Sequence, residues 1–506
     1  MAVRRDGARN SSRNSSRTGG QGRDRVDARG FRGRRILLAG MAVDSLGSGM
    51  YIPFNLVFFQ HVTHLPLALI GAVLTGTGLL SLAFLPAIGS AVDRFGAKPV
   101  ILGLYAARAV GFALYPLATG LPLFALLALV TGLGDRGYAA AQPAWIGELT
   151  SGSAMDRLLA LSRSLRNAGM GGGTLLASAL IGGLGDSGFL AAAWLNAASF
   201  LGAGLLMLRV QPPAHAAGQP RTAARADAAR AETPHADTAR ADTPHADTAA
   251  GGTAAVGYRT VLRDRPYLAL TAVNFLVSFG FTSLSTLLPI FALGVLHLPA
   301  ALTGTAFALN TAVVALAAVP ATRLIRRIGT RTRTGAIGAA LFAAAFLGQA
   351  LLGTLRPQNT TVALAALLGG VLLATAGELL YSAGSSAMAS SAAPAPARGR
   401  YLATYMLSWS LAQSLSAGLY TSTLAVDGRL PWLIVAAAAA TGAALLLRLT
   451  RRLPAEAVYP TSLLVGENVS KDTATAPVAA APANPAPAVA APGKSSAPAV
   501  AAPNAR

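Results

Sequence analysis

The sequence contains no cysteine and few charged residues for its length. Without a thiol among its 506 residues, disulfides, thiol catalysis and cysteine-ligated metals are excluded. Asp, Glu, Lys and Arg make up 12% of the chain, whereas a soluble protein carries roughly 25%. This shortage of charge argues against a soluble globular protein.

Motifs for enzyme chemistry are also missing. There is no G-x-x-x-x-G-K-[ST] loop, so ATP-driven work is not expected. The six histidines are scattered mainly in predicted loops and do not gather a nucleophile, a base or metal ligands. We therefore predict that the chain is not an enzyme and needs no cofactor or metal.

Long apolar runs dominate the sequence, which is 53% hydrophobic with a mean hydropathy of +0.50. Runs of ~20 apolar residues can cross the ~30 Å hydrocarbon core as helices, which satisfy their own backbone hydrogen bonds in lipid. The pattern predicts an all-α integral membrane protein with twelve transmembrane helices in two sets of six. The predicted spans are about 36–59, 65–88, 99–118, 121–146, 158–183, 187–208, 267–291, 299–321, 334–354, 361–387, 401–424 and 430–449.

Three segments differ in composition from the spans. Residues 1–35 form a basic tail with eleven Arg against three Asp, and the apolar stretch that follows has no signal-peptide cleavage pattern. Residues 209–262 contain the near-repeat RAETPHADTA–RADTPHADTA, and residues 453–506 are rich in Pro and Ala. Such segments cannot bury a core. We expect all three to be disordered, flanking six-helix bundles at 36–208 and 263–452.

Positive charge is distributed unevenly between the two sides of the predicted spans. By the positive-inside rule the basic side is cytoplasmic, which places both termini and the central linker in the cytoplasm of a cell-membrane protein. The net charge of +21 then serves topology and lipid contact, so we expect the lipid bilayer and not nucleic acid as a partner. The basic side carries Arg94, Lys98, Arg157, Arg323, Arg326, Arg327, Arg331, Arg333, Arg398 and Arg400; the other carries Arg356 and Arg429.

Residues 89–100, GSAVDRFGAKPV, place charge and glycine between the second and third spans. The stretch resembles the signature of the major facilitator superfamily, roughly G-x-x-x-D-R/K-x-G-x-R/K, at Gly89, Asp93, Arg94, Gly96 and Lys98. The bias toward Ala, Arg and Gly suggests a GC-rich bacterial gene. The chain is thus identified as resembling bacterial, actinobacterial-type, proton-coupled exporters of drugs or metabolites.

This resemblance implies a cytoplasmic gate formed by these five residues. Gly89 would let another helix approach closely, and Gly96 would take a positive φ. Asp93 would dock at the partially positive N-terminus of the eleventh span, near Arg400. The alternative is an ordinary basic turn, which explains Arg94 and Lys98 but leaves Gly89 and Asp93 unexplained. A degenerate second copy, with Gly329 aligned to Gly96, lacks the acid.

Six charged residues lie within the predicted spans, about six to ten residues from the basic side. A charge at the bilayer centre costs ~2.5–3.5 kcal/mol, so each is a candidate for proton coupling or substrate binding. We expect Asp135 to pair with Arg108 or Arg166, and Arg136 with Asp44; static helix–helix ties are the alternative. Glu378 has no evident cationic partner in its half and is the leading candidate proton carrier. The six are Asp44, Arg108, Asp135, Arg136, Arg166 and Glu378.

Together these features predict a secondary transporter that works by alternating access, with proton-coupled efflux of a small, largely apolar drug or metabolite. The fifth span, NAGMGGGTLLASALIGG over residues 167–183, lacks the Gly-Pro pair found in many exporters of the superfamily. A metabolite or sugar uptake permease therefore stays an alternative. A non-transporting membrane sensor is a rival from another class, but it would need an ordered extra domain.

Overall fold

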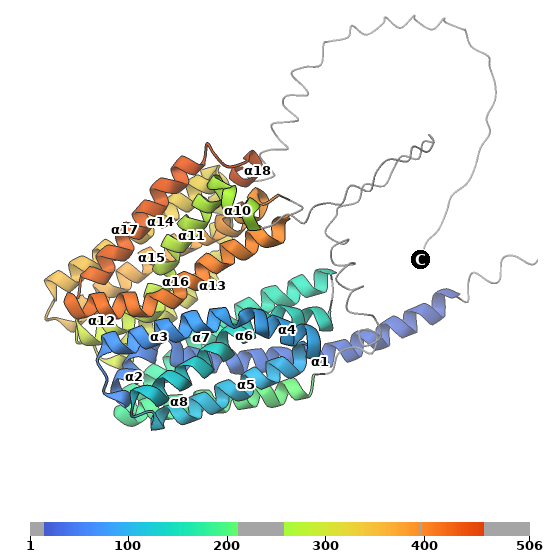
Figure 1. The fold of residues 1–506 in the computed structure, drawn as a ribbon, viewed down its shortest axis with the longest axis horizontal. Helices are drawn as coiled ribbons and strands as arrows, with labels where there is room; N and C mark the ends of the chain where they lie inside the picture. The colour runs from blue at the N-terminus through green and yellow to red at the C-terminus, as the bar shows by residue number, and fades with distance from the viewer. Residues whose placement is uncertain (1–14, 151, 211–257, 395–396, 460–506) are drawn as a thin grey trace, which may run out of the picture. The chain divides into compact units, whose positions relative to one another are not determined.

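The computed structural model describes residues 15–150, 152–210, 258–394 and 397–459. These residues are overwhelmingly helical, with no strand among them, and Figure 1 shows their arrangement. The fold class predicted from the apolar runs is confirmed. The elements are α1 (Ser15–Tyr51), η1 (Ile52–Phe54), α2 (Asn55–Thr63), α3 (Leu67–Ala83), α4 (Leu85–Phe95), α5 (Ala97–Leu114), η2 (Tyr115–Leu117), α6 (Leu121–Leu149), α7 (Gly152–Leu184), α8 (Asp186–Leu208), α10 (Tyr258–Arg263), α11 (Arg265–Thr282), η3 (Ser283–Leu287), α12 (Leu288–Gly294), α13 (Ala300–Ile328), α14 (Arg331–Leu355), α15 (Thr360–Ala392), α16 (Arg398–Val426), α17 (Leu430–Leu449) and α18 (Ala455–Val458).

Eight of the described helical segments are long and apolar enough to cross a membrane, and the α3–α4 pair, bent by 42°, makes a ninth. The helices α7, α13 and α16 are also long, with 33, 29 and 29 residues. Together with the nine apolar segments, these three helices follow the order of the twelve predicted spans. The full count of twelve stays a prediction.

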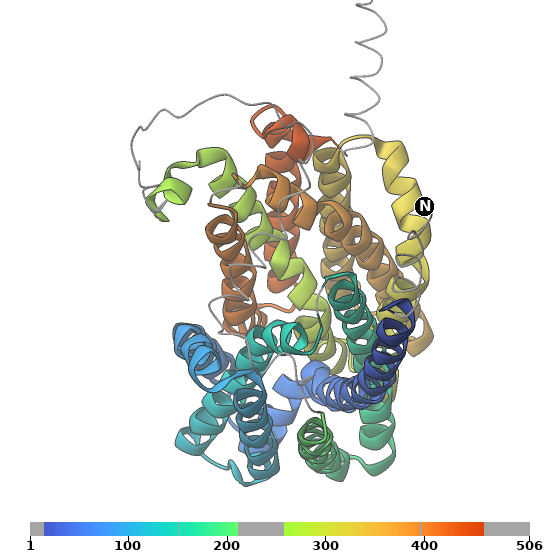
Figure 2. The ribbon, with the colours of Figure 1, turned by 90° about the vertical axis from the view of Figure 1, so that its right-hand side faces the viewer.

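The described residues bury two hydrophobic cores. One is built from α1 to α8, and the other from α10 to α18. We call these groups the first half and the second half; Figure 2 shows them as two groups of helices. The halves meet chiefly along two helix pairs, α3 with α16 and α7 with α13.

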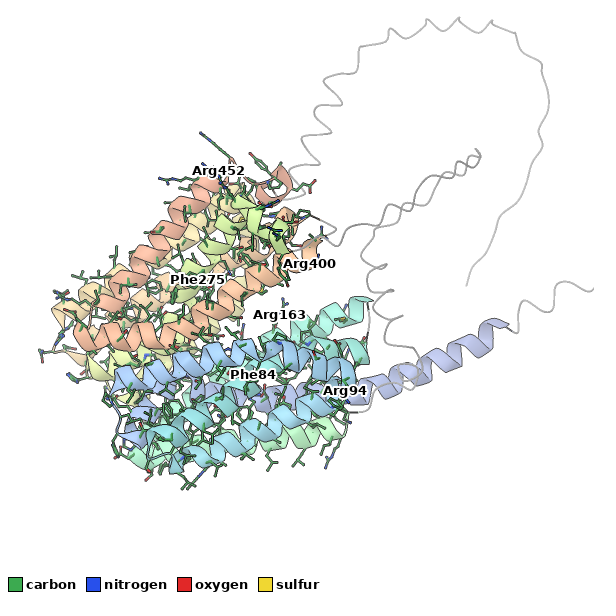
Figure 3. The ribbon with its side chains drawn as sticks, viewed as in Figure 1. Phe84, Arg94, Arg163, Phe275, Arg400 and Arg452 are labelled. Carbon is green, nitrogen blue, oxygen red and sulfur yellow. The ribbon has the colours of Figure 1, made fainter. Side chains whose placement is uncertain are left out.

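We call the end where α4 ends and α16 begins the basic face, and the end where α3 begins and α16 ends the opposite face. Figure 3 labels Arg94, Arg400 and Arg452 at the basic face. Connections at the opposite face include those between α2 and α3, α14 and α15, and α16 and α17.

Three boundaries differ from the predicted disordered segments. Helix α1 begins at Ser15, because each residue added to a helix anchored in an apolar span gains a hydrogen bond at low cost. Helix α10 lies inside the predicted linker, and its Val261 is fully buried in the second core. Helix α18 lies inside the predicted C-terminal tail, where Ala457 and Val458 are buried in the same core. The remainder of the tails and the linker repeat lie outside the described residues.

Candidate functional site

The GSAVDRFGAKPV stretch forms the end of α4, a sharp turn and the start of α5. Gly96 has φ +92°, the positive value expected from its place in the motif. Gly329, at the end of α13, also has a positive φ, +94°, although its ψ of −81° differs from the +159° of Gly96. An L-residue with a side chain disfavours this region, which explains glycine at both positions.

Two contacts fix the far side of this turn. The Lys98 Nζ donates to the carbonyl oxygens of Leu208 and Val210, at 3.0 and 2.7 Å, and so binds the open C-terminal end of α8. The Ala97 backbone N–H donates to Glu148 Oε1 at 3.1 Å, so an acid on α6 satisfies a free amide at the start of α5. Sequence reasoning missed Glu148 because it considered only acids inside the predicted spans and in the 89–100 motif. Its position two residues beyond the fourth span was the available signal.

The predicted docking of Asp93 on α16 is not made in this structure. Asp93 is exposed, and no hydrogen bond or ion pair joins it to any part of the chain that the structure describes. A Cβ placed on Gly89 would have nothing within 4 Å. Figure 3 shows Arg94 and Arg400, which mark the two expected partners, well apart on separate halves. Arg94 instead lies over its neighbour Phe95, 5.3 Å from the ring centre.

The reason lies in where the two halves touch. The Gly418 N–H on α16 donates to Thr75 Oγ1 on α3 at 2.9 Å. A Cβ on Gly71 would overlap Thr421 Oγ1 and lie 2.7 Å from the Ala417 carbonyl oxygen. These residues lie in the parts of α3 and α16 nearest the opposite face. Contact there leaves Asp93 and the start of α16 without contact at the basic face.

The second helix pair, α7 with α13, is also tightly packed near the opposite face. A Cβ on Gly304 of α13 would lie 2.7 Å from the Cβ of Ser178 on α7, and one on Gly171 would lie 2.9 Å from Thr311 Cγ2. Small residues let helix backbones approach this closely in a membrane. Both seams between the halves are therefore tight toward the opposite face.

Arg108 of α5 is the centre of a charge network in the first half. Its Nη1 donates to Asp44 Oδ1 at 2.8 Å, and its Nη2 donates to Ser48 Oγ at 3.1 Å. Its Nε lies 2.7 Å from Asp135 Oδ1, which makes an ion pair without a well-directed hydrogen bond. The guanidinium carbon also lies 3.7 Å from the centre of the Phe200 ring. One buried cation thus holds carboxylates from α1 and α6.

The two carboxylates differ in exposure. The Asp44 side chain is 10% exposed, whereas that of Asp135 is 45% exposed although it lies midway along α6. The predicted pairing of Asp135 with Arg108 is confirmed. Asp44 is therefore the enclosed member of the network, and Asp135 is the member whose side chain is accessible.

The predicted pairing of Arg136 with Asp44 is wrong. Arg136 Nη2 donates to Ser414 Oγ on α16 at 2.9 Å, so this arginine crosses to the other half. Adjacent helical residues point ~100° apart, and since Asp135 turns toward Arg108, Arg136 is directed away from that network. Gly78 of α3 leaves room for it, since a Cβ there would lie 3.1 Å from Arg136 Nη2.

Arg166 and Glu378 stand outside these contacts. Arg166 of α7 is exposed, and no ion pair joins it to a described residue. Glu378 of α15 accepts a hydrogen bond through Oε2 from Asn310 Nδ2 of α13 at 3.1 Å. Asn310 Nδ2 also donates to Thr375 Oγ1 at 2.9 Å. No described Lys, Arg or His lies within ion-pair distance of Glu378, as the sequence suggested.

Comparison with known proteins identifies the class. Two packed halves of long apolar helices, with charged residues buried among them, are typical of a multi-pass membrane protein. The family model of the Major Facilitator Superfamily matches residues 37–417 and, in an overlapping match, residues 296–488. The chain therefore belongs to the major facilitator superfamily, and it is a transporter and not an enzyme.

Relatives and similar structures agree with that membership. Over 171 residues the chain is 29% identical to the tetracycline resistance protein, class G, of Vibrio anguillarum; the match covers 33% of this chain and 42% of that protein. The chain thus matches less than half the length of that relative. Similar folds include a bacterial homologue of the iron transporter ferroportin in an inward-facing state, with TM-score 0.62 and 15% identity over 83% of this chain and 98% of that chain. The inward-open xylose transporter XylE from E. coli has TM-score 0.60 and 15% identity over 83% and 96%.

Proposed function

We propose that this protein exports a small, largely apolar drug or metabolite in exchange for protons. Glu378 is the observation that carries the proposal. A carboxylate held by a neutral amide, with no cation beside it, is costly to ionise at this depth and gains or loses a proton more readily than a salt-bridged acid. Because its amide partner Asn310 lies on α13, which packs against α7 of the other half, the proton state of Glu378 is linked to a moving seam.

The basic face is proposed to be cytoplasmic, in accord with the positive-inside rule. Both termini and the linker then lie in the cytoplasm. The tight seams at the opposite face, and the free Asp93 at the basic face, correspond to a state open toward the cytoplasm. Helix α16 begins at Arg398 after Ala397, which offers no side-chain cap. In the outward-open state the first backbone N–H groups of α16 would donate to the Asp93 carboxylate, and the close approach at Gly89 would form.

The other charged residues in the spans have different proposed roles. Arg108 and Asp44 form an ion pair that holds α1 and α5 together. The exposed side chains of Asp135 and Arg166 contact substrate or exchange protons. Arg136 changes partner as the halves move, since its bond to Ser414 crosses between them.

Export is favoured over uptake by the similarity to a tetracycline resistance protein. An apolar cargo is supported by aromatic side chains in the second half, where Phe281 lies 5.2 Å from Trp409 and 6.0 Å from Tyr381, centre to centre. Glu378 lies one turn before Tyr381 on the same helix. Uptake of a metabolite is the second candidate, and the direction of flux distinguishes the two.

Glu378→Gln is expected to abolish uphill dye transport driven by a pH gradient. The amide keeps the shape and the bond to Asn310 but cannot carry a proton. The measurement is accumulation of a fluorescent lipophilic dye in inside-out vesicles acidified inside, with exchange down a dye gradient as the second readout. Asp186→Asn, an acid with an 84% exposed side chain, is the matched control. Gradient-driven accumulation at the wild-type level in the Glu378 variant would remove its role, and flux in the other direction would favour uptake.

Asp93→Asn is expected to slow transport about fivefold, since a charge at a helix N-terminus contributes ~1 kcal/mol. The loss should appear in the turnover rate and not in the amount of folded protein, because Asp93 makes no bond in the present state. Initial rates in the same vesicles, normalised to protein content, measure it. The exposed acid Glu456 at the same face supplies the control variant, Glu456→Gln. Normal turnover in Asp93→Asn would reduce the stretch to a topology signal.

A further inference from the structure

A groove of about 460 Å³ opens at the opposite face of the second half. It lies between the end of α14 and the connection from α16 to α17. Its apolar floor turns toward the lipid-facing surface, with Leu347 53% and Leu351 57% exposed. The volume falls in the range of small-ligand sites, ~300–1,000 Å³. The lining residues are Leu347, Ala350, Leu351, Thr354, Val426, Asp427, Arg429, Leu430 and Leu433.

Arg429 lines this groove, and Arg356 lies beside it near Gly428. Among the described connections at the opposite face, Arg356 and Arg429 are the only Lys or Arg residues. Each lies against the other's loop: a Cβ on Gly428 would lie 3.8 Å from Arg356 Nη2, and one on Gly353 would lie 3.5 Å from Arg429 Cγ. Two arginines from separate connections therefore meet at one point.

These arginines retain free donors. Asp427 accepts from Arg429 Nε and Nη2, at 3.0 and 2.8 Å, and also from its backbone N–H. Hydrogen bonds from Arg429 hold the pKa of Asp427 at about 2, so that carboxylate is charged at neutral pH. Arg356 donates only through its Nε, to the Gly353 carbonyl oxygen. Two cations and one anion leave a net charge of +1, with the Arg356 Nη groups and Arg429 Nη1 available.

The backbone of Arg356 supports a placed side chain. Its φ of +40° is in the left-handed region, where glycine usually ends a helix. An arginine there costs conformational energy that glycine would not. This backbone conformation places the guanidinium over the C-terminus of α14, where the helix dipole favours a cation.

We propose that this groove binds one anionic diacyl phospholipid, with the phosphate on Arg356 and Arg429 and an acyl chain along Leu347, Leu351 and Leu433. An arginine fork matches the planar pair of phosphate oxygens, and the groove beneath supplies apolar contact. Inorganic phosphate alone would gain only the contact with the arginines, at a site with one net positive charge. The lipid, which carries both parts, is the occupant that fits.

The site is tested by titrating the purified full-length protein with dioleoylphosphatidylglycerol and reading the tightest lipid adduct by native mass spectrometry. Dioleoylphosphatidylcholine and inorganic phosphate are the comparison probes. We expect phosphatidylglycerol to bind more tightly than phosphatidylcholine. Arg356→Gln with Arg429→Gln should weaken phosphatidylglycerol about fivefold per arginine and leave phosphatidylcholine unchanged.

Three further variants distinguish the contribution of the arginines from that of the apolar groove. Arg448→Gln removes an exposed arginine from the other end of α17 and should change nothing. Leu351→Trp fills the groove, keeps both arginines and should weaken both lipids. Arg356→Gln alone keeps the Asp427–Arg429 contacts and serves if the double variant is unstable. Equal binding of the two lipids, an undiminished phosphatidylglycerol adduct in the arginine variants, or displacement of the lipid by millimolar phosphate would each overturn the proposal.

Discussion

Oxidation of a Thr75→Cys/Gly418→Cys variant is expected to stop transport, and reduction is expected to restore it. In the present state a Cβ on Gly418 would lie 3.4 Å from the Thr75 Cβ, close to the 3.5–4.5 Å of a disulfide. The two residues already share a hydrogen bond across the halves. A covalent bond at that point holds the opposite face closed. Since alternating access requires the seam to open, net flux should fall to the background of empty vesicles.

The chain is suited to this experiment because it contains no cysteine of its own. The two single variants, Thr75→Cys and Gly418→Cys, are the controls and should transport equally with and without oxidant. Counting free thiols under denaturing conditions shows whether the bond has formed. Undiminished flux in a fully oxidised double variant would mean that the α3–α16 seam does not open during transport.

The spans and the turn were predictable because each depends on local sequence. An apolar run of ~20 residues has one stable form in lipid, so the positions of the most apolar helices follow from hydropathy. Gly96 could be assigned a positive φ because the turn it makes is short and needs no distant partner. Gly329, which aligns with Gly96 in the second half, also has a positive φ.

Partners across helices were harder to predict, because they depend on rotation and tilt. The layer of charges was visible from the sequence, but any cation at that depth could have served Asp44. Asp44 and Asp135 share one arginine, and Arg136 binds a neutral serine 278 residues away. Glu148 of α6 was missed for a related reason: the amide that it accepts from belongs to another helix, at the start of α5. The state of the transporter was also beyond reach, because one sequence serves every state.

Arg108→Gln is expected to destabilise the protein more than any other single charge removal. Breaking a buried ion pair on one side typically costs ~3–5 kcal/mol, because the remaining charge is left without compensation. Here Asp44 would be left buried without its cation, and the contact with Phe200 would be lost as well. The measurement is the melting temperature and the monodisperse fraction of the full-length protein in detergent. Arg163→Gln, an exposed arginine on α7 labelled in Figure 3, is the matched control.

A second substitution tests the physical reason. Adding Asp44→Asn to Arg108→Gln removes the stranded charge, so the double variant should melt at a higher temperature than Arg108→Gln alone. Adding Asp135→Asn instead should recover less, because the 45% exposed Asp135 side chain keeps its hydration. This order distinguishes an electrostatic tie from simple packing. Were Arg108 important only for filling space, neither asparagine would restore stability, and the two double variants would melt together with the single one.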